Sequence, residues 1–174
     1  MRSTRWPERF GESLGPPFSL LRDVLHYDAD TGELRWRVRL SNRVVVGGVA
    51  GFTDPRGAVW IKLFGKAYLA HRLVWAWVFG AWPRECIDHI DGNPSNNRLG
   101  NLRDVSHAIN LQNERRARRN NKSGFLGVSR DRNRWAASLM TTGWKRHIGT
   151  FDTPQEAHAA YVAAKRIAHA GCTL

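Results

Sequence analysis

A carboxylate, an imidazole and an amide stand at positions that suit the hydrolysis of a phosphodiester bond. Asp88 and His89 are neighbours, and Asn110 follows Asp88 by 22 positions. The Asp88 carboxylate and the Asn110 side-chain carbonyl are hard oxygen ligands, which suit Mg²⁺ or Mn²⁺. His89, neutral near pH 7, could take a proton from an attacking water. These three side chains are the candidate reaction centre.

Two short strands and a helix must bring these side chains together. Residues 86–90 predict a strand, residues 91–97 are dense in turn formers, and the chain returns through a second strand at 101–105. Ser106 is a candidate N-cap for a helix that carries Asn110. Neighbours on a strand point to opposite faces, so Asp88 and His89 can share a site only if a bulge or bend turns one of them.

The segment IDHIDGNPSNNRLGNLRDVSHAIN closely resembles the HNH endonuclease motif of phage and homing enzymes. The resemblance implies a ββα-metal hairpin that binds one divalent ion. It implies that His89 is the general base, that Asn101 braces the loop as a second catalytic residue, and that Asp88 and Asn110 bind the metal. Asp replaces the leading His of the widest family pattern and Asn replaces the last one. Both departures favour an oxygen-preferring metal over zinc.

The chain has only two cysteines, Cys86 and Cys172. They can neither staple a small secreted fold nor form a four-thiolate zinc site. Many proteins that carry the HNH motif brace their fold with zinc held by paired CxxC motifs, so packing by the N-terminal sheet must serve here instead. The cysteine count fits a reducing compartment, and we expect a cytoplasmic protein in a bacterial host cell, with a phage as a candidate source.

A small antiparallel sheet and a helix are expected before this motif. Residues 1–17 mix Arg, Gly and Pro, which predicts a flexible basic tail. Residues 18–25 predict a helix and residues 33–38 a half-buried strand. The β-branched runs 44–46 and 59–64 predict further strands, with Gly65-Lys66 as a hairpin turn. Residues 71–79 predict a buried helix that Gly80 ends, and His71 at its start is expected to be structural.

The net charge of +12 makes a polyanion the expected partner. Between residues 114 and 146, ten basic side chains face two acidic ones. Such a concentration favours binding to the DNA backbone, and the predicted contacts are Arg115, Arg116, Arg118, Arg119, Lys122, Arg130, Arg132, Arg134, Trp144, Lys145 and Arg146. The longest apolar stretch, 73–82, is about ten residues, too short to cross a bilayer. The N-terminus lacks the apolar segment of a secretory signal.

Beyond residue 123 the pattern predicts strands at 125–130, 134–139 and 146–151, then a helix with Thr153 as N-cap and Glu156 as its capping-box partner. The segments GFLGVSRDRNRWAAS, HIGTFDTPQEAHAAY and AAKRIAHAG resemble the AP2 DNA-binding domain. The resemblance implies a sheet that enters the major groove through Arg and Trp contacts. The side chains expected on the sheet face opposite the helix are Arg130, Arg132, Arg134, Trp144 and Arg146.

The sequence therefore predicts an α+β protein with an HNH nuclease domain at 18–113, a ββα-metal core at about 85–113, a basic linker at 114–123 and an AP2-like domain at 124–174. We expect a Mg²⁺-dependent or Mn²⁺-dependent endonuclease that nicks double-stranded DNA, as a monomer or weak homodimer. One alternative is a non-catalytic phage DNA-binding regulator. Another is an RNA-binding or ribosome-associated basic protein. Arg98, Arg103 and His107 either touch phosphate or lie solvated on the surface.

Overall fold

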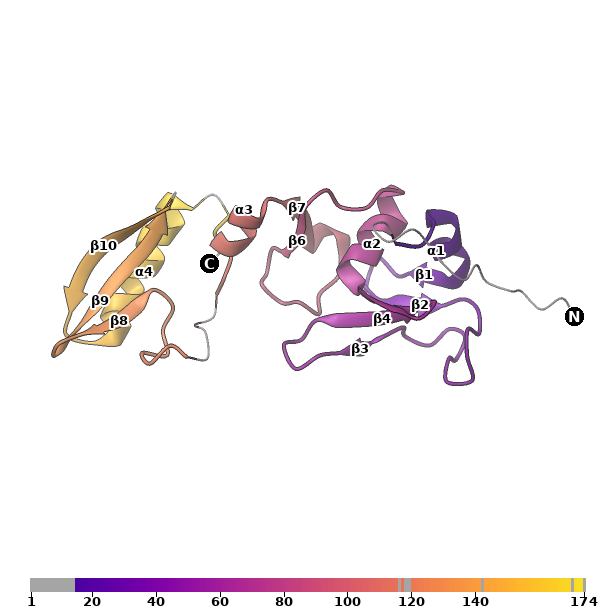
Figure 1. The fold of residues 1–174 in the computed structure, drawn as a ribbon, viewed down its shortest axis with the longest axis horizontal. Coiled ribbons are helices and arrows are strands. Elements are labelled where there is room, and N and C mark those ends of the chain that lie inside the picture. The colour runs from indigo at the N-terminus through magenta and orange to yellow at the C-terminus, as the bar shows by residue number, and fades with distance from the viewer. Residues whose placement is uncertain (1–14, 116, 118–119, 142, 170, 174) are drawn as a thin grey trace, which may run out of the picture. The chain divides into compact units, whose positions relative to one another are not determined.

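The computed structural model describes residues 15–115, 117, 120–141, 143–169 and 171–173. The chain divides into two compact units, residues 1–105 and 106–174. Each unit combines helices with small antiparallel sheets, which makes the fold a mixed α+β type (Figure 1). Most of the predicted basic tail, residues 1–14, lies outside the described residues. Within the described residues, no helix has both the length and the apolar character that crossing a bilayer requires.

Residues 15–105, the described part of the first unit, contain two α-helices and three small sheets. The chain runs through α1 (Phe18–Val24), β1 (Leu25–Tyr27), β2 (Leu34–Trp36), β3 (Phe52–Thr53), β4 (Val59–Leu63), β5 (Lys66–Leu69), α2 (Ala70–Phe79), β6 (Cys86–His89), the 3₁₀ turn η1 (Leu99–Asn101) and β7 (Leu102–Val105). Strands β1 and β2 pair, β4 lies between β3 and β5, and β6 pairs with β7. All of these pairs are antiparallel.

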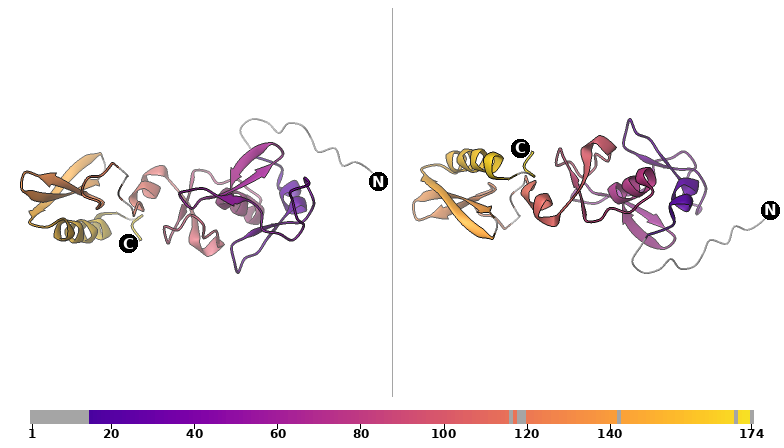
Figure 2. Two further views of the ribbon diagram at one scale, coloured as in Figure 1. Left: turned by 90° about the horizontal axis from the view of Figure 1, so that it is seen from below. Right: turned by 90° about the horizontal axis from the view of Figure 1, so that it is seen from above.

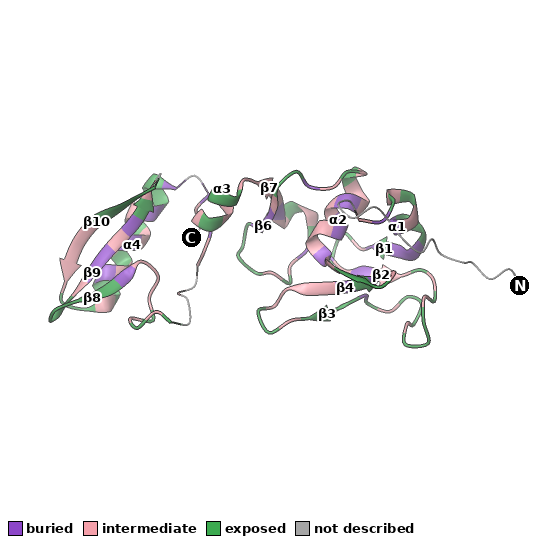
Figure 3. Ribbon diagram, in the orientation of Figure 1, coloured by how far each residue is buried: buried purple, intermediate pink, exposed green. Residues whose placement is uncertain are grey.

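Helix α2 lies at the centre of the first unit's core. Its Leu73 and Val74 are fully buried, together with Leu21 of α1 and Ile61 of β4 (Figure 3). The helix ends at Gly80, whose φ of 62° places it in the left-handed region, so the predicted C-terminal stop is confirmed. The core thereby fixes the segment that leads from α2 into β6.

Two local predictions in this unit are wrong. Residues 44–46 form no strand; Val45 and Val46 are 71% and 57% exposed, so their β-branched side chains lack the packing that would favour a strand. The hairpin turn between β4 and β5 is Phe64-Gly65 instead of Gly65-Lys66. Both turn residues have positive φ, 49° and 84°, as type I′ turns require. The turn is displaced by one residue because Lys66 pairs with Leu63.

The second unit is a sheet covered by a helix. It contains α3 (His107–Gln112), β8 (Val128–Asp131), β9 (Arg134–Thr141), β10 (Trp144–Phe151) and α4 (Pro154–Ala168), with β9 in the middle of the sheet. Helix α4 lies along one face of the sheet in both views of Figure 2. The predicted capping box is present, since Thr153 accepts from the Glu156 amide and the Glu156 side chain accepts from the Thr153 amide.

Candidate active site

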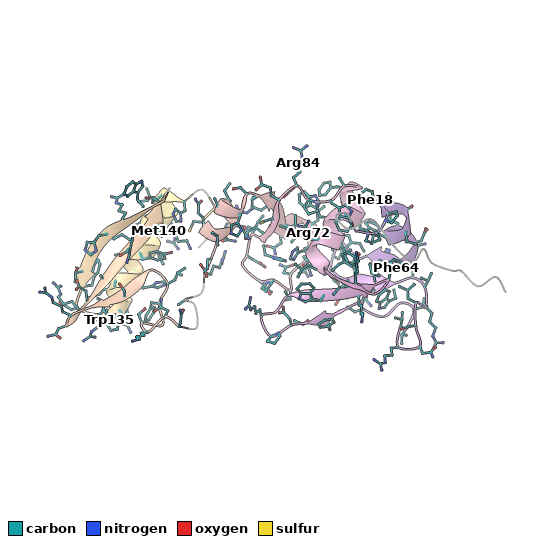
Figure 4. The ribbon with its side chains drawn as sticks, viewed as in Figure 1. Phe18, Phe64, Arg72, Arg84, Trp135 and Met140 are labelled. Atoms are coloured by element: carbon teal, nitrogen blue, oxygen red, sulfur yellow. The ribbon has the colours of Figure 1, made fainter. Side chains whose placement is uncertain are left out.

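Two side chains, Asp104 of β7 and Arg72 of α2, fix the start of strand β6. The Asp104 carboxylate accepts the backbone amides of Arg84 at 2.7 Å and Glu85 at 3.0 Å. Arg72 of α2, which is labelled in Figure 4, donates to the Glu85 carbonyl at 3.0 Å. The path from the core helix into β6 is therefore held by hydrogen bonds on both sides, which positions the strand that carries Asp88 and His89.

Asp88 is buried and pairs with the residue directly opposite it on β7. Arg103 donates through Nε and Nη2 to Asp88 Oδ2 at 2.9 and 2.7 Å. The Asp88 side chain is 7% exposed and that of Arg103 is 25% exposed. A buried carboxylate needs such a partner, because removing an ion from water is costly. Arg103 thus has a structural partner within the hairpin and is not merely a solvated charge.

A bulge was one of the two ways in which Asp88 and His89 could be turned to one side, and none occurs between them in the described hairpin. Asp88 pairs with Arg103 and His89 with Leu102 in regular register. The two side chains therefore leave β6 on opposite faces. His89 is the last residue of the strand, and its carbonyl accepts the Gly92 amide in the turn that follows. Any shared site must lie at this end of β6.

The loop from Ile90 to Asn101 is closed by the Asn101 side chain. Its Oδ1 accepts the Asp91 amide at 2.9 Å, while its Nδ2 donates to Asp91 Oδ1 at 2.9 Å and to the Asn96 carbonyl at 2.8 Å. Burial raises the pKa of Asp91, but hydrogen bonds from the Asn93 amide and from the Asn96 and Asn101 side chains outweigh it and lower that pKa overall. Asn101 therefore lies where a loop-bracing residue is needed.

His89 is enclosed by Asn97 and His71. Its Nε2 lies 3.1 Å from Asn97 Oδ1, and its ring meets the His71 ring edge to face at a centroid distance of 5.0 Å. Burial, together with the nearby charges of His89 and Arg72, lowers the pKa of His71 from 6.5 to about 3. His71 is therefore a neutral, half-buried neighbour of the candidate base at neutral pH.

The hairpin of β1 and β2 contacts the loop between Ile90 and Asn101. The Tyr27 hydroxyl donates to the Asn97 carbonyl at 3.1 Å and accepts the Leu99 amide at 2.9 Å. Arg98 Nε donates to the Asp30 carbonyl at 2.7 Å. Gly32, at φ 79°, approaches so closely that a Cβ there would lie 2.5 Å from the Arg98 nitrogen. We expected the N-terminal sheet to brace the fold, because the chain has no paired CxxC motifs. These contacts connect the β1–β2 hairpin to the loop in that way.

Comparison with known proteins identifies this hairpin. Residues 68–112 match the HNH endonuclease family. The chain is also 38% identical over 89 residues to Protein 3.8 of Escherichia phage T7, an alignment that covers 49% of this chain and 72% of the phage protein. The chain belongs to the HNH endonuclease family. No solved structure gives a significant match. The HNH match ends at residue 112, before the segments that resemble AP2 domains.

The HNH assignment includes helix α3, which follows β7 directly. Ser106 caps this helix by accepting the Ile109 amide, as predicted, and Asn110 is half-buried on it. His107 is exposed in its first turn. Asp88 and Asn110 belong to different units, so their convergence on one ion stays a prediction. In chemical type, a carboxylate and an amide oxygen are both suitable ligands for Mg²⁺ or Mn²⁺.

Helix α3 is anchored within the second unit by the C-terminal segment. Gly171 donates its amide to Gln112 Oε1 at 3.1 Å, and Thr173 hydrogen-bonds to Asn113. Arg115 donates to the Thr173 carbonyl at 2.7 Å. The end of the HNH segment is thus tied to residues that follow α4, far along the chain.

The predicted DNA contacts fall into three groups. Arg116, Arg118 and Arg119 lie outside the described residues. Arg115 is half-buried and bonded to Thr173, whereas Lys122 is exposed. The other predicted contacts are exposed residues of the sheet or its turns, namely Arg130, Arg132, Arg134, Trp144, Lys145 and Arg146.

The sheet register corrects which of these side chains lie opposite α4. Cross-strand partners share a face. Arg130 pairs with Trp135, over whose ring it stacks at 4.8 Å, and Arg146 pairs with Leu139. Trp135 and Leu139 both belong to the core beneath α4. The side chains of Arg130 and Arg146 therefore leave their strands on the sheet face that α4 covers. Trp144, paired with Thr141, lies two positions before Arg146 and so leaves β10 on the same face. Arg132 lies in the turn before β9.

Arg134 and Lys145 remain on the open face, since their positions alternate with those of the core residues. Arg134 donates to Asp152 at 2.8 Å, and Lys145 pairs with Met140. A hollow of about 410 Å³ on this side of the sheet is lined by Ser129, Asp131, Ala136, Ser138, Lys145 and His147, and also by Arg130 of the edge strand β8. The open face is therefore polar and carries fewer cations than we expected.

Sequence reasoning missed Tyr27 and Asn97, and it gave His71 only a structural part. His71 lies 18 positions before His89, and Tyr27 lies 70 positions before the Asn97 carbonyl that it contacts. No local pattern marks such distant partners. The paired asparagines at 96 and 97 were the one available signal, since buried amides in a loop need hydrogen-bond partners.

Proposed function

We propose that this HNH family member is a metal-dependent DNA endonuclease that cuts one strand of a duplex at each active site. The observation that carries the proposal is the setting of His89: a buried imidazole at the end of β6, next to Asp88, with the following loop closed by Asn101. A proton acceptor held in a fixed place is what general-base hydrolysis needs.

In this mechanism His89 takes a proton from a water molecule aligned with the scissile phosphorus. Because Asp88 and His89 leave β6 on opposite faces, the phosphate would lie at the end of the strand, where both can approach it. Asn101 keeps the loop, and with it the end of β6, in one conformation. Rigid positioning of the base lowers the entropic cost of the reaction.

Asp88 and Asn110 would hold the Mg²⁺ or Mn²⁺ ion. When bound, the ion would stabilise negative charge on the phosphate and on the leaving 3′ oxygen. Arg103 donates two hydrogen bonds to one Asp88 oxygen and so orients that carboxylate. The expected preference for oxygen-binding metals follows from the two ligand types.

The second unit would anchor the duplex in the manner of an AP2-like domain. The support is its three-stranded sheet covered by one helix, with exposed cations on its strands and turns. Backbone contacts by Lys122, Arg134 and Lys145 would give affinity that falls with salt. In this proposal the protein acts as a monomer or weak homodimer. Because one relative is a phage protein, the proposed location is a bacterial cytoplasm during phage infection.

A supercoiled plasmid tests the proposal directly. The wild-type protein should convert it to open circles with Mg²⁺ and leave it intact with EDTA. His89→Ala should abolish nicking while keeping DNA affinity, and His26→Ala, an exposed histidine of β1, should nick normally. Tight binding by the wild type without nicking, under Mg²⁺ and Mn²⁺ alike, would reject the nuclease and select the DNA-binding regulator.

A further inference from the structure

The side chain that faces His89 Nε2 is an amide, not a carboxylate or a backbone carbonyl. Asn97 Oδ1 lies 3.1 Å from this nitrogen. Both residues are buried, with His89 8% and Asn97 4% exposed. Hydrogen bonds between buried neutral groups fix side-chain geometry because water cannot easily replace them.

The orientation of the Asn97 amide follows from its other contacts. Its Nδ2 donates to the Ser95 carbonyl at 3.4 Å, and its backbone carbonyl accepts the Tyr27 hydroxyl at 3.1 Å. A carbonyl oxygen can only accept, so the amide nitrogen must face Ser95 and the amide oxygen must face His89. The reverse orientation would place the Ser95 oxygen against Asn97 Oδ1, two acceptors without a proton between them.

We infer that Asn97 is a positioning residue that holds His89 in its Nε2-protonated tautomer. An amide oxygen accepts only from a protonated nitrogen, so the ring lone pair lies on Nδ1. The edge-to-face contact with His71 restrains the ring plane at the same time. The tautomer assignment is argued from the Asn97 and Ser95 contacts, whereas its catalytic consequence rests on the proposed function.

The assignment names the atom that acts. A water proton passes to the Nδ1 lone pair, and the water oxygen forms its bond to phosphorus with the electron pair that this releases. The bond from phosphorus to the 3′ oxygen breaks, and that oxygen takes a proton from solvent. His89, then protonated on both nitrogens, keeps its Nε2 hydrogen bond to Asn97 throughout, so the acceptor need not move during the reaction.

Nitrogen-15 NMR of the full-length protein tests the tautomer without any need for activity. Long-range proton-nitrogen spectra distinguish the two neutral tautomers, and His89→Gln assigns the signal among the seven histidines. The wild type should show His89 protonated on Nε2 at neutral pH. Asn97→Asp, which keeps an oxygen acceptor, should retain that pattern, and Asn97→Leu should lose it. An Nδ1-protonated His89 in the wild type, or an unchanged pattern in Asn97→Leu, would overturn the inference.

Nicking kinetics give the second readout. Loss of a residue that orients a reacting group costs about 10-fold to 100-fold in activity. Asn97→Leu should lower kcat by that factor with KM unchanged, Asn97→Asp should recover most of the loss, and Asn42→Leu, an exposed asparagine, serves as control. Equal kcat for Asn97→Leu and Asn42→Leu would contradict the positioning role. A wild type that shows the Nε2 tautomer but never nicks rejects the proposed function and leaves the tautomer assignment in place.

Discussion

The Tyr27 hydroxyl donates to the backbone carbonyl of Asn97, and so joins strand β1 to the loop that encloses His89. The same hydroxyl accepts the Leu99 amide. One buried side chain therefore satisfies a donor and an acceptor of the loop, which cannot obtain them from regular secondary structure. In this HNH protein the hairpin of β1 and β2 is therefore part of the framework around the candidate active site.

Tyr27→Phe should destabilise the protein and slow nicking. The change leaves the Asn97 carbonyl and the Leu99 amide without their partner, and an unsatisfied buried polar group costs about 1–3 kcal/mol. Unfolding in urea measures the free-energy loss, and plasmid relaxation measures the rate. Tyr68→Phe, at a half-buried tyrosine of β5, is the control. Equal stability of the two variants would show that the Tyr27 hydroxyl contributes nothing.

Two glycines with nearly the same backbone conformation separate strain from crowding. Gly32 has φ 79° and faces the Arg98 backbone, while Gly47 has φ 81° and open space around its Cβ position. Gly47→Ala should cost about 1–2 kcal/mol, the strain of a left-handed residue. Gly32→Ala should cost more, because its methyl group would displace the loop. We expect urea unfolding to rank them in this order, and the opposite order would refute the close approach.

The stability of the protein should fall in acid through His71. Its folded pKa of about 3 lies below the ordinary value of 6.5, so folding favours the neutral ring. The stabilisation is fully present above pH 6.5 and is lost as the pH falls toward 3. His71→Gln should therefore flatten the pH dependence of the unfolding free energy in this window, while His26→Gln should not. Arg72 and His89 face the ring and are unchanged in both variants. Parallel profiles for all three proteins would reject this assignment.

Arg103→Met should make stability depend on Mg²⁺. The variant removes the Arg103 cation that pairs with the buried Asp88 carboxylate, and breaking such a pair costs up to about 3–5 kcal/mol. If Asp88 is a metal ligand, Mg²⁺ can supply the missing positive charge. The ion should then raise the Tm of Arg103→Met more than that of the wild type. The double variant Asp88→Asn with Arg103→Met should lose this response, and a retained response would place the ion elsewhere.

Neighbouring cations on β10 test which sheet face binds DNA. Lys145 shares the open face with Met140, whereas Arg146 starts from the α4 side with Leu139. If the open face contacts phosphates, Lys145→Ala should weaken binding and reduce the salt dependence of log K by about one unit, with little change for Arg146→Ala. Fluorescence anisotropy over a salt series measures both. A larger effect of Arg146→Ala would assign DNA binding to the other side.

Features set by near neighbours could be predicted from the sequence. The Thr153-Glu156 capping box, the Ser106 cap and the Gly80 stop depend on groups within a few residues of one another. The order of strand, loop, strand and helix around Asp88 and His89 followed from the same kind of signal. The loop-closing position of Asn101 came from the family resemblance and not from its local pattern.

Features that depend on strand register and on packing between distant residues could not be predicted from the sequence. The β-branched run at 44–46 has the composition of a strand but finds no partner, and Phe64 occupies a turn position that its residue type disfavours. A displacement of one residue in pairing moves a side chain to the other face of a sheet. This is why Arg130 and Arg146 start from the face that we did not expect, although the Arg130 side chain also lines the hollow on the open face.

The sequence by itself determined which residue types are available for hydrolysis, their order along the chain, and the local elements that carry them. Only the tertiary structure decided that Asn97 and His71 enclose His89, that Arg103 pairs with Asp88, and that Tyr27 supports the loop. The physical reason is that local hydrogen bonds are encoded within a few residues. Contacts between distant residues form only when a whole unit packs its core, and many sequence positions decide that packing together.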